Sequence, residues 1–238
     1  MSFPGSVEFD ASVPLWSGAS DVAARQLRDA KAVPSEASRR ASAFGQSVWR
    51  LAGPTAFQSI ILTALFLGAG SPFGPHGMAG PTPGAALLSL AFFSAQVTGR
   101  RFGPSYGSSQ IWLGLLLSVV TLMVLPSDFI RLIASRAMPD MREAVAFGLA
   151  FLFAGLLSTA LYETARGGLW WSAPLLGMLT SAMTFSLVFY PMAYSTDPTW
   201  ASAMMADMAT LSEMAIASLV PYWLLRAYLP PQGGFGGY

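Results

Sequence analysis

The chain has 238 residues, of which 53% are hydrophobic and only 11% are charged, whereas about a quarter of the residues in soluble domains are charged. This shortage of charge indicates a membrane protein, and a formal net charge of +1 offers no basic surface for nucleic acid. Zero cysteines exclude disulfides, thiolate catalysis, cysteine zinc sites and iron–sulfur clusters, and the single histidine, His76, excludes a multi-histidine metal site within one chain.

The first part of the chain, residues 1–51, is a polar tail rich in Ala, Ser and charged residues. It lacks a basic region followed by an apolar core, so a cleaved signal peptide is not expected. Short helices are expected at about 19–32 and about 35–51. The second has an apolar stripe that can lie on a membrane surface, formed by Ala41, Phe44, Val48 and Leu51. A mostly disordered tail is the equally weighted alternative.

Six segments of the remaining chain are apolar enough to predict membrane-spanning helices, which need about 20 mostly apolar residues. They are residues 54–70, 85–99, 109–133, 143–163, 169–194 and 206–229. The expected fold class is therefore all-α, a polytopic membrane protein with six transmembrane helices. The expected organisation is a cytoplasmic N-terminal tail over 1–51, a membrane domain over 52–229 and a Gly/Pro-rich C-terminal tail over 230–238.

Arginines near the segment ends predict the orientation in the membrane, because positive residues favour the cytoplasmic side. One side carries Arg39, Arg40, Arg50, Arg100, Arg101, Arg166 and Arg226. The other side carries Arg131, Arg136 and Arg142, mixed with acidic residues. Both termini are therefore expected in the cytoplasm.

Polar side chains inside the apolar segments are the candidates for a site, because a charge at mid-helix costs roughly 2.5–3.5 kcal/mol unless it is paired or hydrated. In the last segment Asp207 lies near the outer end, and Glu213 is the most deeply placed acid. Glu213 is either a substrate-binding or proton-carrying carboxylate, or an acid that serves helix contacts or lies at headgroup level. Pro221 is expected to free the carbonyl of Ala217 and kink this helix.

The fifth segment carries Thr180 and Thr184 on one face. They either hydrogen-bond a ligand or bond their own backbone, as such residues commonly do in apolar helices. Aromatic residues near segment ends favour two interfacial belts over a ligand cage. They include Trp112, Trp170, Trp171, Tyr190, Tyr194, Trp200, Tyr222, Trp223 and Tyr228. The sequence contains no nucleophile–base pair, metal-ligand set or phosphate loop, so neither an enzyme nor a cofactor is expected.

The stretch LAFFSAQVTGRRFG, residues 90–103, runs from an apolar segment through Gln96 to Arg100 and Gly103. GGLWWSAPLL, residues 167–176, opens the fifth segment, and FYPMAY, residues 189–194, ends it. Together these stretches resemble the VUT family, six-helix queuosine-precursor transporters that carry preQ-type deazaguanines across the bacterial inner membrane. The resemblance covers about residues 55–229 and implies a location in a bacterial inner membrane, either cytoplasmic or intracytoplasmic.

The resemblance implies matches at some family positions and departures at others. Arg100 and Gly103 match the second-helix motif, while Gln96 stands where the family has an acid. Phe185 stands where the family has a polar or acidic residue in the fifth helix. In the last helix Glu213 matches an acidic position of the family. One turn later, where the family has a basic residue, this chain has Ala217. An amide can satisfy the donors and acceptors of a purine-like edge, but the loss of ionisable groups removes proton coupling through them.

Two functions from different classes follow. In the first, a transporter-like protein binds or moves a small planar polar solute, with Gln96, Thr184 and Glu213 forming hydrogen bonds and Arg100 as an electrostatic or structural partner at the cytoplasmic mouth. In the second, the chain is a non-transporting accessory or structural subunit of a larger respiratory or photosynthetic membrane complex. It would contact that complex through its tail or its helix faces. The lipid bilayer is the expected surrounding in both cases.

Overall fold

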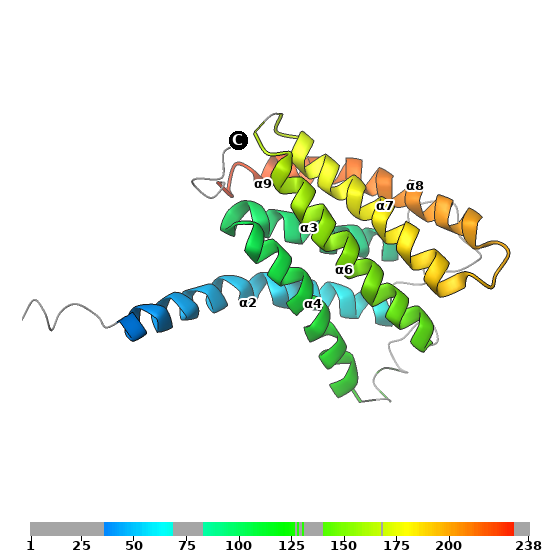
Figure 1. Ribbon diagram of the computed structural model, residues 1–238, viewed down its shortest axis with the longest axis horizontal. Helices are drawn as coiled ribbons and strands as arrows, with labels where there is room; N and C mark the ends of the chain where they lie inside the picture. Colours follow the sequence, from blue (N-terminus) through cyan, green and yellow to red (C-terminus); the bar gives the residue numbers. More distant parts are fainter. Residues whose placement is uncertain are drawn as a thin grey trace, which may run out of the picture. The chain divides into compact units, whose positions relative to one another are not determined.

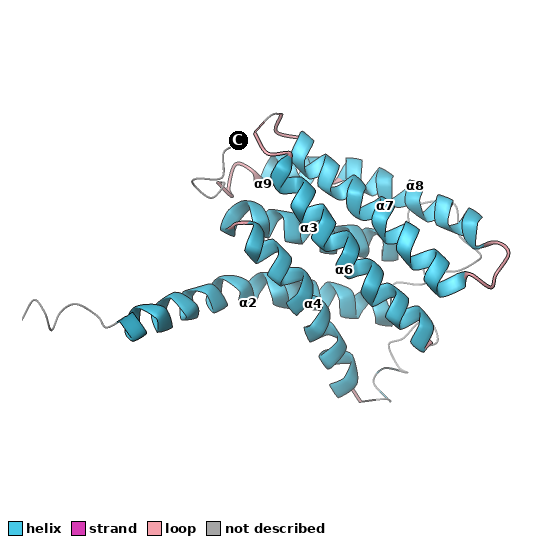
Figure 2. Ribbon diagram, in the orientation of Figure 1, coloured by secondary structure: helices cyan, strands magenta, loops and turns pink. Residues whose placement is uncertain are grey.

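The computed structural model describes residues 36–68, 83–126, 128, 130, 140–167 and 169–230. Within these ranges every regular element is an α-helix, in agreement with the expected all-α class (Figure 2). The chain divides into two compact units, Met1–Val48 and Trp49–Tyr238. The expected helix at 19–32, the loop residue His76 and the C-terminal tail beyond residue 230 lie outside the described residues.

Helix α2, Glu36–Gly68, is 33 residues long and continues through Pro54. The sequence predicted two helices here, separated at this proline, and the structure joins them. The Pro54 carbonyl accepts a hydrogen bond of 3.2 Å from Gln110 Nε2 on α4, Pro104–Val124, and this bond joins the two helices. Prolines are tolerated inside membrane helices.

Five stretches of the described chain are long and apolar enough to cross a membrane, which is the pattern of a helical multi-pass membrane protein. They are Phe44–Leu67, Pro104–Val124, Met141–Thr164, Ser172–Tyr194 and Trp200–Leu225. Helix α3, Pro83–Phe102, corresponds to the remaining expected segment and is not among them. Its last turn carries the charged pair Arg100 and Arg101, which shortens its apolar part.

A glycine turn joins α3 to α4. Gly103 has a φ of 104°, a backbone conformation that side chains disfavour, and its N–H donates to the Gly99 carbonyl at 2.8 Å. Pro104 then begins α4, where a missing N–H has no cost. Helix α4 ends at Val124, earlier than the expected residue 133, because the residue before Pro126 is extended rather than helical.

The remaining helices are α6, Met141–Thr164; α7, Ser172–Tyr194; α8, Trp200–Ala217; and α9, Leu219–Leu225. Asp140 caps α6 by accepting a hydrogen bond from the Glu143 N–H at 2.6 Å. The interruption between α8 and α9 lies at Ser218, one turn before Pro221. The interruption lies next to Ala217, whose carbonyl Pro221 is expected to leave free.

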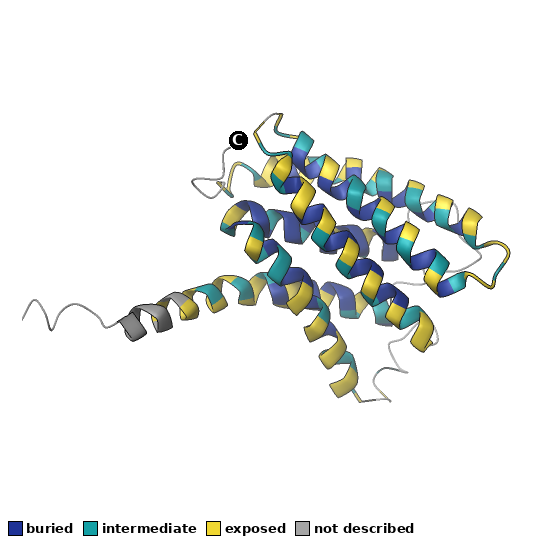
Figure 3. Ribbon diagram, in the orientation of Figure 1, coloured by how far each residue is buried: buried dark blue, intermediate teal, exposed yellow. Residues whose placement is uncertain are grey.

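Helices α6 and α7 pack along each other, and α8 packs on α7 (Figure 1). Their buried residues lie on the facing sides of these helices (Figure 3). The core is aromatic: Phe147 lies 5.5 Å from Phe185 and Phe185 lies 5.3 Å from Phe189, measured between ring centroids. On α3, Phe92 stacks on Phe151 at 5.0 Å. All five rings are buried, so aromatic packing fills the contact between α3, α6 and α7.

Candidate functional site

Gln96 of α3 lies inside the bundle, with 1% of its surface exposed. Its Nε2 donates a hydrogen bond of 3.0 Å to Ser158 Oγ on α6. The same Nε2 lies 2.5 Å from where a Cβ would be at Gly177 of α7, so the glycine makes the room that the amide occupies. Gln96 therefore joins three helices by close packing and an interhelical hydrogen bond.

A second buried glutamine has a similar relation to a glycine. Gln58 of α2 is fully buried, and a Cβ at Gly114 of α4 would lie 2.9 Å from its Cγ. In both cases a glutamine on one helix fills the notch left by a glycine on another. Repetition of this arrangement favours helix packing as the role of these amides.

The Gln96 amide keeps one polar atom without a partner. Its Oε1 is buried and accepts no hydrogen bond within the part of the chain that the structure describes. A buried carbonyl of this kind is where an ordered water or a ligand donor would bind. This atom is the feature of Gln96 that still fits a binding role.

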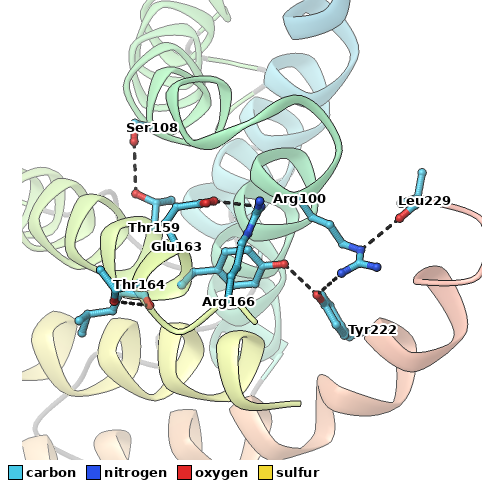
Figure 4. Close-up of polar contacts among 10 residues, drawn as sticks. Arg100, Ser108, Thr159, Glu163, Thr164, Arg166, Tyr222 and Leu229 are labelled. Atoms are coloured by element: carbon cyan, nitrogen blue, oxygen red, sulfur yellow. Dashed lines mark hydrogen bonds and ion pairs between the residues drawn. The ribbon is translucent and has the colours of Figure 1, made fainter. Parts of the chain in front are cut away.

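Arg100, one turn after Gln96, is buried and reaches the C-terminal part of the chain (Figure 4). Its Nη1 donates to the Tyr222 hydroxyl at 3.1 Å, and its Nε donates to the Leu229 carbonyl at 3.1 Å. The guanidinium also lies 5.5 Å from the centre of the Tyr222 ring. Arg100 thus connects the end of α3 to α9 and the residues that follow it.

The Tyr222 hydroxyl continues this contact to α6. It lies 2.8 Å from the hydroxyl of Tyr162, whose ring is 5.0 Å from the Arg166 guanidinium. Arg166 in turn pairs with Glu163 at 3.0 Å (Figure 4). The contact is electrostatic, because the buried Arg166 Nη atoms have no aligned hydrogen-bond acceptor among the described residues. We refer to Arg100, Tyr162, Glu163, Arg166 and Tyr222 as the arginine–tyrosine cluster.

The tyrosines of this cluster were not predicted as site residues. Tyr222 was assigned to an interfacial belt, and it is buried with 2% exposure; Tyr190, assigned likewise, is 1% exposed. The spacing of Tyr162 and Arg166, four residues apart at a helix end, is the sequence signal that would have pointed to a ring–guanidinium contact. Trp112, Trp223 and Tyr228 are exposed, as a belt requires.

The other two predicted site residues differ from Gln96 and Arg100 in burial. Thr184 of α7 is half-buried, and Glu213 of α8 is exposed. Glu213 makes no hydrogen bond or ion pair with the described residues. The face of α8 that packs inward carries Asp207 instead, whose Oδ2 accepts a hydrogen bond of 3.1 Å from Ser186 of α7. The acid on the inward face of the last helix is thus Asp207, which the sequence placed near the outer end of this segment, whereas Glu213 lies deepest along the segment and faces outward.

No group of three or more His, Asp or Glu side chains that could hold a metal ion occurs among the described residues. Comparisons of the chain with protein-family models, curated proteins and solved structures gave no match.

Replacing Tyr222 with phenylalanine tests the arginine–tyrosine cluster. The change removes the hydroxyl that joins Arg100 to Tyr162 and keeps the ring, so we expect a loss of about 0.5–1.5 kcal/mol in the free energy of unfolding. Steric trapping in bicelles measures this quantity. Tyr228→Phe is the matched control, because Tyr228 is 82% exposed and should lose nothing. Equal stability of the two variants would remove the cluster's role in holding the helix ends together.

Proposed function

We propose that this chain is a non-transporting subunit of a larger membrane-protein complex in a bacterial inner membrane. Its body would span the bilayer six times, with α3 as the least apolar span and both termini in the cytoplasm. Arg100, Arg101, Arg166 and Arg226 follow or end α3, α6 and α9 and support this orientation. A respiratory or photosynthetic complex is the class of assembly that we expect to contain it.

The observation that carries this proposal is the different burial of Gln96 and Glu213. A planar solute held between α3, α7 and α8 would need their polar groups to face one space. Gln96 is instead packed against Gly177 and Ser158, while Glu213 lies on the exposed side of α8. These polar side chains therefore suit helix packing and outward contact better than binding of a shared solute.

The aromatic core supports the same proposal. Phe185, at the position where the resembling transporters carry a polar or acidic residue, is fully buried. Its ring lies within 5.5 Å of the ring centroids of Phe147 and Phe189. Apolar rings in this contact neither hydrogen-bond a solute nor carry a proton.

Affinity purification from native membranes tests the proposal. The tagged full chain, extracted with digitonin, is expected to bring down the subunits of one defined complex in constant stoichiometry, as measured by quantitative mass spectrometry. A tagged membrane protein of similar abundance and unrelated function serves as the control. Recovery of the chain alone, in digitonin and in polymer-bounded native discs alike, would contradict a subunit role.

Transport is the second candidate function, and the unpartnered Gln96 Oε1 is the observation that favours it. In that case the amide would hydrogen-bond a planar solute such as a deazaguanine, one turn inside the buried Arg100.

Uptake of radiolabelled preQ-type deazaguanine into cells tests transport. The subunit proposal predicts no uptake above the empty-vector control for the wild type or for Gln96→Leu. Uptake by the wild type that Gln96→Leu abolishes, at equal protein amounts in the membrane, would establish transport and overturn the packing interpretation of Gln96.

A further inference from the structure

Helix α8 has an exposed stripe opposite the face that packs on α7 and α3. Its residues recur every three or four positions, as one side of a helix requires. They are Ser202, Met205, Ala209, Glu213 and Ile216, continuing at Val220 of α9. We refer to them as the α8 outer stripe. Apart from the serine at one end, Glu213 is its only polar member.

The inward face of α8 is accounted for within the chain. Ala203, Asp207, Leu211 and Ala215 are buried there, and Asp207 already has a hydrogen bond from Ser186. The outer stripe has no such cover from the described helices: Met205 is 55% exposed, Ile216 59% and Val220 65%. Contact with lipid is enough to explain why these apolar residues are exposed.

Glu213 is different from its neighbours on the stripe. It lies at the midpoint of the apolar stretch Trp200–Leu225, where the hydrocarbon core is deepest. Acidic side chains at this depth are rare and nearly always pair with another polar group. Because Glu213 has no partner within the described chain, the group that pairs with it must come from elsewhere.

We propose that the α8 outer stripe docks a transmembrane helix of a different protein, and that this helix carries a Lys or Arg at the depth of Glu213. The inference rests on the proposed subunit function and names the contact surface. The cation would satisfy the carboxylate inside the bilayer. Ala209, one turn before Glu213, leaves room for the close approach that such a contact needs.

A second copy of the chain fits this surface less well. Most basic residues of the described helices lie at helix ends, including Arg100, Arg142, Arg166 and Arg226. Arg50 lies within α2, in the first third of the apolar stretch Phe44–Leu67. None of them lies at mid-span, so the described helices of a copy offer Glu213 another Glu213 and no cation at its depth. Two like charges at this depth repel.

Photocrosslinking tests which protein covers the stripe. A photoreactive residue is placed at Ala209 or Ile216 of the tagged full chain in its native membrane, with Leu187 as the control because it is 55% exposed on α7. We expect the two stripe positions to crosslink to one and the same subunit, with Lys or Arg in the middle of a transmembrane helix, and Leu187 not to. Crosslinks to lipid alone, to a second copy of the chain or to a subunit without such a residue would overturn the proposal.

Charge substitutions test the role of Glu213 in this contact. Glu213→Lys should lower the amount of co-purified partner by about tenfold or more, and Glu213→Gln should lower it less, because an amide still hydrogen-bonds. Combining Glu213→Lys with an acidic residue at the partner's basic position should restore the amount of co-purified partner. Asp128→Lys makes the same change of charge at an exposed residue outside α8 and is the control.

The two proposals fail in different ways. If the wild type and Glu213→Lys recover the same complex in equal amounts, the stripe is not the docking surface and the subunit function stands. If the wild type recovers no complex, the subunit function fails and the docking proposal fails with it. Because Glu213 is exposed, the Glu213→Gln chain should elute from size-exclusion chromatography in strong detergent like the wild type.

Discussion

Replacing Phe147 with alanine is expected to lower the free energy of unfolding by about 3–5 kcal/mol, the usual cost of removing a buried aromatic ring. Phe147 is 2% exposed, and its ring contacts those of Phe66, Phe151, Phe185 and Phe189 at centroid distances from 4.8 to 6.4 Å. The variant would leave a cavity where α2, α6 and α7 meet. Steric trapping in bicelles measures the loss.

Phe153→Ala is the matched control for this change. Phe153 lies on the same helix as Phe147, but it is 60% exposed, so its ring contributes little to packing within the chain. We expect the control to change stability by less than about 1 kcal/mol. A Phe147 variant as stable as the Phe153 variant would contradict a packed aromatic core, and would favour a space between the helices that a solute could fill.

Replacing Gly177 with alanine is expected to destabilise the protein by about 1–3 kcal/mol, because the new methyl group overpacks the contact with α3 and α6. Its Cβ would lie 2.5 Å from Gln96 Nε2 and 3.2 Å from the Ser158 carbonyl oxygen. The amide cannot move away freely, since it is hydrogen-bonded to Ser158 Oγ. The same unfolding measurement reports the effect.

Two further variants make this prediction specific. Adding Gln96→Ala to Gly177→Ala removes the side chain that the methyl group meets, so the double variant should recover part of the lost stability, and the two changes should not be additive. Gly148→Ala on α6 is the control, because its Cβ would meet nothing closer than 4.0 Å. Additive losses in the double variant would mean that Gln96 does not occupy the notch at Gly177.

The sequence predicted which segments form helices better than it predicted the residues at which the helices begin and end. Apolar length predicted the membrane helices, and Pro221 predicted the interruption before α9. Pro54 did not end α2, because a proline removes one helical hydrogen bond and membrane helices tolerate this loss. Pro126 explains the early end of α4, a local signal that the sequence did offer.

The faces of the helices were the hardest property to predict. In a soluble protein the apolar side of a helix packs inward, but in lipid both sides are apolar and hydrophobic periodicity loses its meaning. The sequence therefore did not decide which way Glu213 faces; it lies on the exposed side of α8, and the inward acid is Asp207. Gln96 was singled out by its polarity, yet its role depends on Gly177, a residue of another helix.

Cysteine accessibility next to Gln96 tests most directly whether the chain is packed as a subunit or open as a transporter. The chain has no cysteine, so Ser158→Cys introduces a single small thiol beside the amide, and Thr196→Cys provides an exposed control in the turn between α7 and α8. With a water-soluble maleimide in native membranes, we predict rapid labelling at residue 196 and labelling at residue 158 only after denaturation with SDS. Rapid labelling at residue 158 that a deazaguanine slows would contradict the packed subunit and establish a solute path.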